Sequence, residues 1–310
     1  MKACVIGGKG KVGNYLMPML VRAGYEVYSV SRGKTDFYLD VPELKQVHEV
    51  YLTRGSEDFE ASIAALGCDV VVDMICFTES DMLRLIDAIK GHVKHYVACG
   101  SLWYHGQSDI VPVKEEDCRN PTGTYGIQKL AMADALRRLW KEEGFPGTIV
   151  HPGHICAPGH IIINPQGNRN VQIFRDLMEG NEVPLPNLGL ETLHHVHAED
   201  IAGIMFAAIQ KGEVSFGEDF HAASERAVSL AGFCREVASW YGKEANLTFH
   251  SLEEFKTLVT PEEYDQTLEH ISRSPAASME KVKTLLGYTP RSIYDTVKEC
   301  LRSPAYGLLK

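Results

Sequence analysis

The feature that most constrains the fold is a glycine-rich turn that follows the first apolar run of the chain. Residues 4–6 predict a short strand, and residues 13–23, with apolar side chains at helical spacing, predict a helix. Gly7 suits a tight turn, Gly10 lets a ligand approach the backbone, and Gly13 lets the helix pack closely on the strand. Free N–H groups at the helix start favour a pyrophosphate. A dinucleotide-binding loop is therefore predicted, with a ligand-free glycine turn as the alternative, and its residues are Gly7, Gly10, Lys11, Val12 and Gly13.

Short β-branched runs alternate with longer helical patterns in the first half of the chain, which indicates βαβ units and a parallel sheet. Strands are expected at residues 27–30, 50–52, 70–73, 95–99 and 148–151, and helices at residues 79–90, 125–143, 174–179, 230–241 and 292–301. The predicted fold class is α/β, a Rossmann-type doubly wound parallel sheet with a smaller C-terminal α+β substrate lobe.

The second half of the chain predicts a separate lobe. After residue 151 the sequence becomes rich in Gly, Pro, Asn and His as far as residue 170, and long irregular loops of this kind are usually functional. We expect residues 1–165 to form the dinucleotide-binding domain, with segments around 190–225 returning to it, and residues 166–310 to form the substrate-binding lobe.

Composition excludes several classes of protein. The 310 residues are 45% hydrophobic, which is typical of a globular protein with a real core. A formal net charge of −10, without a long basic run, argues against a nucleic-acid partner. No stretch reaches the roughly 18 apolar residues of a membrane span, and the N-terminus lacks a signal-peptide pattern. We therefore expect a cytoplasmic protein that binds no membrane.

The cysteines and histidines give no sign of a metal site. The eight cysteines are dispersed and lack C-x-x-C spacing, so reduced thiols are expected. They are Cys4, Cys68, Cys76, Cys99, Cys118, Cys156, Cys234 and Cys300. The histidines cluster around residues 151–160 and 194–197, but their spacing shows no convergence of ligands, so no metal is predicted.

The end of the second predicted strand indicates which dinucleotide is bound. An Asp or Glu at this position would accept hydrogen bonds from the ribose hydroxyls of NAD, whereas this chain has Ser31 and Arg32. A hydroxyl beside a guanidinium can hold a 2′-phosphate, which favours NADP(H). NAD(H) is the alternative, with Arg32 an ordinary solvated charge.

A serine, a tyrosine and a lysine indicate the chemistry. Tyr125 and Lys129 are four residues apart and so lie on one face of a helix. A nearby ammonium favours the phenolate and is expected to lower the tyrosine pKa from its usual value of about 10. Ser101 follows the fifth predicted strand, at the edge of the sheet where ligands bind. The alternative is that Tyr125 and Lys129 are surface residues at the start of a helix and have no catalytic role.

Together these residues resemble the extended branch of the short-chain dehydrogenase/reductase superfamily, the NAD-dependent epimerase/dehydratase family. Four further segments support the resemblance, at residues 69–73, 115–117, 196–202 and 286–290. The resemblance implies that Tyr125 exchanges a proton with the substrate oxygen, that Ser101 bonds that oxygen, and that Lys129 lowers the tyrosine pKa and bonds the nicotinamide ribose. Hydride would pass between nicotinamide and a hydroxyl or carbonyl carbon.

Two departures from the family pattern concern the substrate. His154 replaces an Asn that often contacts substrate in the family, and Leu193 stands where sugar-nucleotide enzymes commonly carry a phosphate-binding Arg. Leucine cannot pair with a phosphate. A small sugar-like or other substrate without a diphosphate is therefore favoured. His154 and His194 are candidates for lining its pocket, and the alternative is that they are polar loop residues facing water.

The leading hypothesis is an NAD(P)-dependent oxidoreductase, or a sugar epimerase or dehydratase. The alternative is a non-catalytic member of the same fold that senses a dinucleotide or associates with RNA. Tyr125 and Lys129 argue against a sensor, and the charge of −10 argues against an RNA partner. A homodimer through helices at residues 79–90 and 125–143 is also expected from the resemblance.

Overall fold

The first lobe is built on a parallel sheet. A computed structural model describes residues 1–117 and 119–308. Its seven-stranded sheet has the order β11-β6-β5-β4-β1-β2-β3, and every neighbouring pair is parallel. The strands are β1 (Lys2–Ile6), β2 (Glu26–Ser31), β3 (His48–Tyr51), β4 (Val70–Asp73), β5 (His95–Cys99), β6 (Gly147–Pro152) and β11 (Asp219–Ala222).

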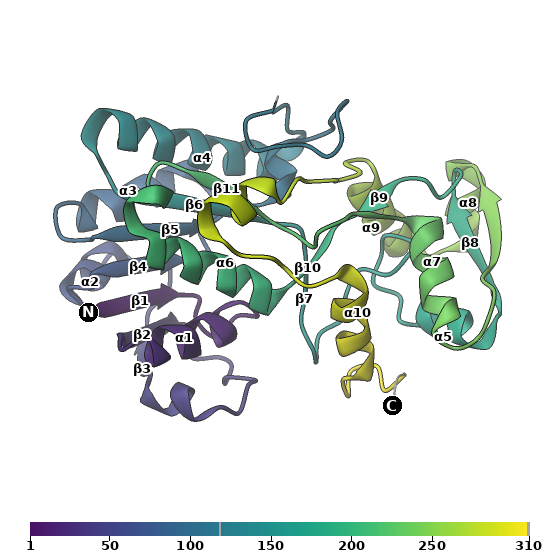
Figure 1. Ribbon diagram of the computed structural model, residues 1–310, viewed down its shortest axis with the longest axis horizontal. Coiled ribbons are helices and arrows are strands. Elements are labelled where there is room, and N and C mark those ends of the chain that lie inside the picture. Colours follow the sequence, from purple (N-terminus) through teal and green to yellow (C-terminus); the bar gives the residue numbers. More distant parts are fainter. Residues whose placement is uncertain (118, 309–310) are drawn as a thin grey trace.

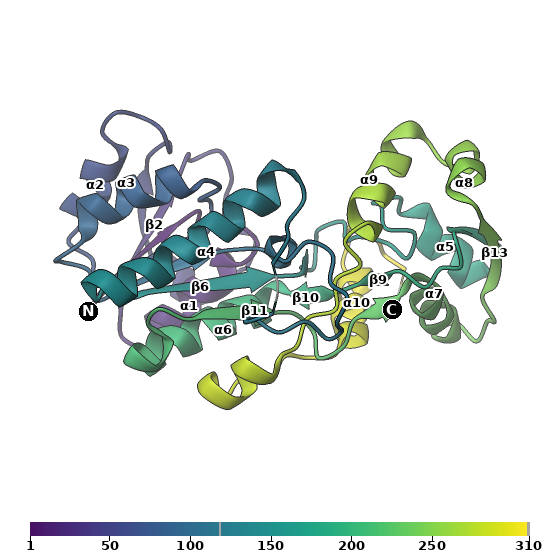
Figure 2. The ribbon, with the colours of Figure 1, turned by 90° about the horizontal axis from the view of Figure 1, so that it is seen from above.

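Helices cover both faces of this sheet (Figure 1, Figure 2). On one face lie α1 (Gly13–Arg22) and α6 (Ala198–Lys211), and on the other lie α2 (Phe59–Ala65), α3 (Glu79–Ile89) and α4 (Gly123–Glu143). Successive side chains of a strand point to opposite faces. Val5 accordingly packs in the core beneath α1 and α6, whereas Ile6 packs in the core beneath α2, α3 and α4.

The strand order places a crevice beside β1. The chain runs outward from β1 to β2 and β3, then returns to β4 on the other side of β1. In such a doubly wound sheet the loops after β1 and β4 diverge, and ligands bind between them at the carboxyl ends of the strands. The glycine turn after β1 lies at this switch point.

The second lobe lies beside the carboxyl ends of these strands, at the right of Figure 1. It has its own apolar core, which includes Phe174, Leu185, Phe233 and Val297. Its elements are α5 (Gln172–Glu179), β8 (Glu182–Pro186), β9 (Thr192–Leu193), β12 (Val228–Ser229), α7 (Leu230–Ser239), β13 (Asn246–His250), α8 (Leu252–Leu258), α9 (Pro261–Ile271) and α10 (Ile293–Arg302). Between the lobes, β7 (His154–Cys156) pairs in parallel with β10 (His195–His197).

The predicted α/β class and doubly wound parallel sheet are confirmed. Each strand expected before residue 152 is present, although the third begins at His48 rather than at residue 50. Seven cysteines are buried free thiols, and Cys118 lies outside the described residues. Across residues 1–117 and 119–308, no helix has the length and apolar character needed to cross a membrane.

Candidate functional site

The glycine turn leaves space where a ligand would need it. Gly7 has a φ of +82°, and a Cβ there would lie 2.8 Å from Ile75 Cγ2. A Cβ on Gly13 would lie 2.2 Å from Gly8 O, so both glycines are required by the packing of the loop itself. A Cβ on Gly10 would meet only Gly7 O, at 3.1 Å. Gly10 therefore borders open space that a side chain would fill.

The start of α1 offers unpaired donors to this space. The helix begins without a side-chain cap and has no acidic residue in its first turn. Within the described parts of the chain, the backbone N–H groups of Lys11 and Val12 have no hydrogen-bond acceptor. Unpaired N–H groups and the helix dipole together attract an anion. These residues fit the pyrophosphate of a dinucleotide, as the sequence predicts.

Two side chains behind the loop fix its shape. The amide of Asn14 donates to Lys9 O at 3.2 Å and to Gly10 O at 3.0 Å, and its Oδ1 accepts from the N–H of Tyr38 at 3.0 Å. The hydroxyl of Tyr38 donates to Lys11 O at 2.7 Å. Because these bonds occupy the loop carbonyls, they hold the loop in one conformation. Sequence patterns did not identify either residue.

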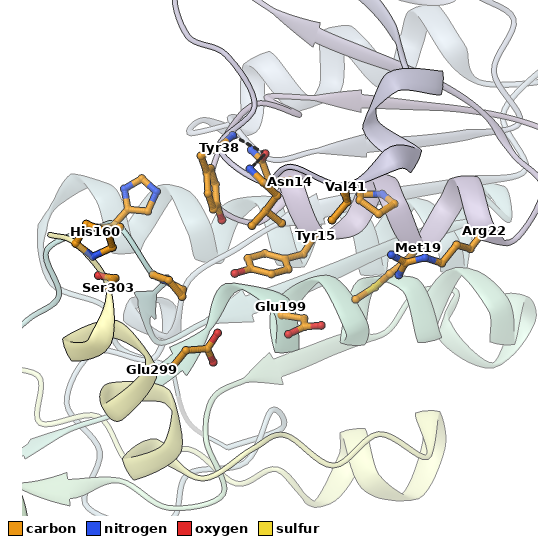
Figure 3. A pocket seen from close by; sticks show the side chains of 15 residues that line it. Asn14, Tyr15, Met19, Arg22, Tyr38, Val41, His160, Glu199, Glu299 and Ser303 are labelled. Atoms are coloured by element: carbon orange, nitrogen blue, oxygen red, sulfur yellow. Dashed lines mark hydrogen bonds between the residues drawn. The ribbon is translucent and has the colours of Figure 1, made fainter. Parts of the chain in front are cut away.

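A cavity of about 620 Å³ lies on this rear side of the loop. Figure 3 shows Tyr15 and Tyr38 on one side of it and Glu199 and Glu299 on the other. It is lined by α1, the loop after β2, the loop after β7, the start of α6 and the end of α10. None of the three predicted catalytic residues lines it. This cavity is therefore separate from the predicted reaction site.

Arg32 is an exposed cation that follows β2, the strand beside β1. It forms no ion pair with any residue that the structure describes, whereas Lys9 pairs with Glu49 at 2.6 Å. The hydroxyl of Ser31 accepts a hydrogen bond from the N–H of Gly33 at 3.2 Å. A guanidinium without a carboxylate partner is available to an anionic ligand.

Lys129 lies beneath the crevice on α4. Its side chain is only 1% exposed, and its Nζ donates to Cys76 O at 2.6 Å and to Cys99 O at 2.7 Å. These carbonyls follow β4 and end β5, so the ammonium is anchored to both strands. Its Nζ lies 5.6 Å from the ring centre of Tyr125. An ammonium has three protons, so one remains for a further acceptor.

Tyr125 and Ser101 lie close together above Lys129. Burial raises the pKa of Tyr125 to about 12 although 39% of the residue is exposed, the Cys99 thiol adds to the rise, and the neighbouring Ser101 hydroxyl lowers it. The net shift is upward, opposite to the lowering by Lys129 that the sequence predicts, because burial is its largest cause. The hydroxyl of Ser101 accepts from the N–H of Trp103 at 3.2 Å, which orients the serine. The three predicted residues thus come together.

Trp103, His270 and Arg273 form a wall beside Tyr125 that the sequence did not reveal. The ring centre of Trp103 lies 5.7 Å from that of Tyr125 and also 5.7 Å from that of His270. The Arg273 guanidinium covers the Trp103 ring at 3.9 Å. Only Trp103 could have been found from the sequence, because it lies two residues after Ser101. His270 and Arg273, in α9 and just after it, are far from Ser101 in sequence.

The two histidine candidates differ. His154 is 8% exposed, neither of its ring nitrogens has a partner among the described residues, and its ring centre lies 5.0 Å from that of His270. His194 is fully buried, and its ring nitrogens bond Ser224 O at 2.7 Å and the N–H of Ala277 at 3.1 Å. The expectation that His194 lines the pocket fails, because it has no free ring nitrogen.

Two further sequence expectations concern charge and metal. Leu193 is fully buried in the core of the second lobe. Across the described residues, no group of three or more His, Cys, Asp or Glu side chains could hold a metal ion.

Comparisons with known proteins identify the family of the chain. The model of the NAD dependent epimerase/dehydratase family matches residues 3–223. The chain is 26% identical over 305 residues to the chloroplast stem-loop binding protein of 41 kDa b from Arabidopsis thaliana, covering 93% of this chain and 75% of that one. It is 24% identical over 321 residues to the UDP-glucose 4-epimerase of Corynebacterium glutamicum, covering 94% and 91%.

The fold is also found in solved structures. A putative epimerase from Burkholderia cenocepacia superimposes with a TM-score of 0.74 at 20% identity, covering 97% of each chain. At this level of identity the likeness concerns the fold alone.

Proposed function

Because this chain belongs to the NAD-dependent epimerase/dehydratase family, we propose that it is a nicotinamide-dependent oxidoreductase or epimerase acting on a hydroxyl or carbonyl group of a small, sugar-like substrate. The observation that carries the proposal is the convergence at the end of β5, where Lys129 Nζ bonds Cys99 O, beside Ser101 and beneath Tyr125. A dinucleotide held on the glycine loop would reach this point along the carboxyl ends of the strands.

The bound nicotinamide supplies or accepts the hydride, and side chains of the protein donate or accept the proton. With a pKa of about 12, Tyr125 is protonated at neutral pH, so its hydroxyl is a proton donor to a substrate oxygen that gains negative charge. Ser101 donates a second hydrogen bond to that oxygen. Lys129 offers its remaining proton to the nicotinamide ribose, and its positive charge stabilises the phenolate left after proton transfer.

NADP(H) is the proposed cofactor, on the strength of Arg32. An unpaired, exposed guanidinium after β2, the strand beside β1, suits the 2′-phosphate that distinguishes NADP from NAD. Arg32→Ala is expected to weaken NADPH binding about tenfold and to change NADH binding by no more than about twofold. Lys34→Ala, an exposed cation two residues further along, is the matched control. Equal losses for both cofactors in Arg32→Ala would favour NAD.

The proposed substrate lacks a diphosphate. Leu193 provides no charge for one. The wall of Trp103, His270 and Arg273 beside Tyr125 continues into His154, and the Arg273 guanidinium lies over the Trp103 ring. Burial lowers the pKa of both histidines, so they are neutral and can donate to and accept from hydroxyl groups. Free sugars and polyols are therefore expected to be turned over in preference to UDP-sugars, and the reverse preference would overturn this part of the proposal.

A stem-loop RNA partner is the second candidate, because a relative that aligns over 93% of this chain is named a stem-loop binding protein. The net charge of −10 opposes it. Gel-shift titration with a stem-loop RNA separates the two, because RNA binding falls steeply with added salt, whereas a neutral sugar substrate is insensitive to it.

The direct test of the main proposal is a spectroscopic screen. Purified protein is mixed with NADPH or NADH and a panel of sugars, polyols and simple ketones while the reduced-nicotinamide absorbance is followed. Net change in absorbance with a substrate identifies an oxidoreductase. Product formation without net change, with nicotinamide retained by the purified protein, identifies an epimerase. No product from any substrate at saturating cofactor would contradict both.

A further inference from the structure

A fully buried histidine lies directly beneath Ser101. His151, near the end of β6, accepts a hydrogen bond on Nδ1 from the backbone N–H of Ser101 at 3.1 Å. The contact joins the turn after β5 to the end of β6, which are neighbouring strands of the sheet (Figure 1). This hydrogen bond therefore fixes the backbone of Ser101 itself.

The hydrogen bond also determines where the histidine proton lies. A nitrogen that accepts an N–H carries no proton, and burial lowers the pKa of His151, so the ring is neutral with its proton on Nε2. That nitrogen lies 3.6 Å from Oδ2 of Asp219, beyond hydrogen-bond distance, and has no hydrogen-bond partner among the described residues. The negative charge of Asp219 favours the tautomer with the proton on Nε2, in which Nδ1 is free to accept from Ser101.

The ring of His151 has no room to turn. It stacks on the ring of Tyr104 with 3.7 Å between ring centres and 2° between planes. On its edge it meets Gly100, where a Cβ would lie 2.2 Å from His151 Nδ1. Tyr104 is itself tied to Asp219 by a hydrogen bond of 3.2 Å from its hydroxyl. The orientation of the His151 ring is therefore fixed by Tyr104 on its face and by Gly100 on its edge.

Asp219 is held in turn as a carboxylate. Arg137 on α4 donates to Oδ2 at 2.7 Å and to Oδ1 at 3.3 Å, and Lys281 Nζ lies 3.7 Å from Oδ1. Burial opposes ionisation, but the neighbouring His151 and the Arg137 guanidinium outweigh it and hold the Asp219 pKa well below its ordinary value. The chain of contacts runs from Arg137 on α4 through Asp219 and His151 to Ser101.

We propose that His151 is a positioning residue for the reaction. With Asp219 behind it, His151 fixes the turn at Ser101 so that the serine hydroxyl is aimed at the reacting substrate oxygen beside Tyr125. The inference rests on the proposed function of Ser101 and Tyr125. A displacement of about 1 Å at such a group can lower a rate about a hundredfold, so a rigid support beneath Ser101 has direct catalytic value.

Three variants separate positioning from stability. His151→Leu removes the acceptor for the Ser101 N–H. His151→Asn keeps an acceptor oxygen near the place of Nδ1. His95→Leu is the matched control, because His95 is also a buried imidazole that joins β5 to β6, bonding Thr148 Oγ1 at 2.8 Å, but it lies at the opposite end of β5 from Ser101.

We expect His151→Leu to lower kcat at least tenfold with little change in KM for the cofactor. His151→Asn should restore most of the rate, and His95→Leu should keep it despite a similar loss of stability. Equal kcat in His151→Leu and His95→Leu, or no recovery in His151→Asn, would overturn the proposal.

A second measurement does not depend on any substrate. In protein labelled with ¹³C at tyrosine Cζ, the resonance of Tyr125 responds to the position of the neighbouring Ser101 hydroxyl, and Tyr125→Phe assigns it. This resonance should shift in His151→Leu and stay in place in His95→Leu and His151→Asn. An unchanged resonance in His151→Leu would refute the positioning role. If the resonance shifts as expected but no substrate is turned over by the wild type, the proposed function fails while the contact stands.

Discussion

Glu115 makes the stability of this protein depend on pH in an unusual direction. Its carboxyl is 2% exposed, and Oε1 accepts from the N–H of His221 at 2.9 Å. Burial raises the pKa of Glu115 from 4.5 to about 7, although hydrogen bonds from the backbone and the charge of Lys281 oppose the rise. The folded protein therefore binds this proton more tightly than the unfolded chain does.

The magnitude follows from the two pKa values. Between pH 4.5 and pH 7 the folded protein retains a proton that the unfolded chain releases, so the free energy of unfolding falls as the pH rises. Each pH unit in this window is worth about 1.4 kcal/mol, which gives a loss of about 3 kcal/mol by pH 7. Above pH 7 the loss levels off.

Glu115→Gln removes the titration and keeps an acceptor for the His221 N–H. The free energy of unfolding is measured with urea at pH 4.5 and at pH 8. Relative to wild type, the free energy of unfolding of the variant should be about 3 kcal/mol higher at pH 8 than at pH 4.5. Glu116→Gln, an exposed neighbour, is the control. Buried histidines such as His95 and His195, with pKa values lowered to about 4, weaken the fold below pH 6.5 equally in all three proteins. An identical pH dependence in wild type and Glu115→Gln would show that the pKa of Glu115 is not raised in the folded protein.

Two further predictions concern the cofactor loop. Gly13→Ala places a Cβ 2.2 Å from Gly8 O and should lower the free energy of unfolding by about 2 kcal/mol. Gly10→Ala should keep the midpoint temperature of thermal unfolding. In calorimetry it should bind the dinucleotide at least about tenfold more weakly. A stable, tightly binding Gly10→Ala would exclude a phosphate at this loop. Tyr38→Phe removes the hydrogen bond to Lys11 O and should weaken dinucleotide binding about fivefold, a loss of about 1 kcal/mol; unchanged binding would show that the rear contact is dispensable.

The fold was predictable because its signals are local. A parallel strand buried on both faces appears as a short β-branched run, and β4 is such a run. The glycine turn follows β1 within a few residues, so its role needs no distant partner. The second lobe was harder, because β9 and β12 have only two residues each and owe their existence to contacts between distant segments.

The same distinction applies to the site. Tyr125 and Lys129 share one helix, and their alignment follows from helical spacing. The pKa of Tyr125 did not follow, because burial by neighbouring segments decides it. His151 and Asp219 are 68 residues apart and meet only because β11 joins β6 after the chain has passed through the second lobe. No spacing rule contains that information.

We propose that Tyr125 transfers the proton at the end of β5, in a reaction whose dinucleotide is held on the glycine loop. The most direct test compares wild type and Tyr125→Phe with the best substrate of the spectroscopic screen. Removing a positioned proton donor should lower kcat by about 10² to 10⁴ and leave the dissociation constant of the cofactor within about threefold. Wild-type kcat in Tyr125→Phe would show that Tyr125 does not transfer the proton.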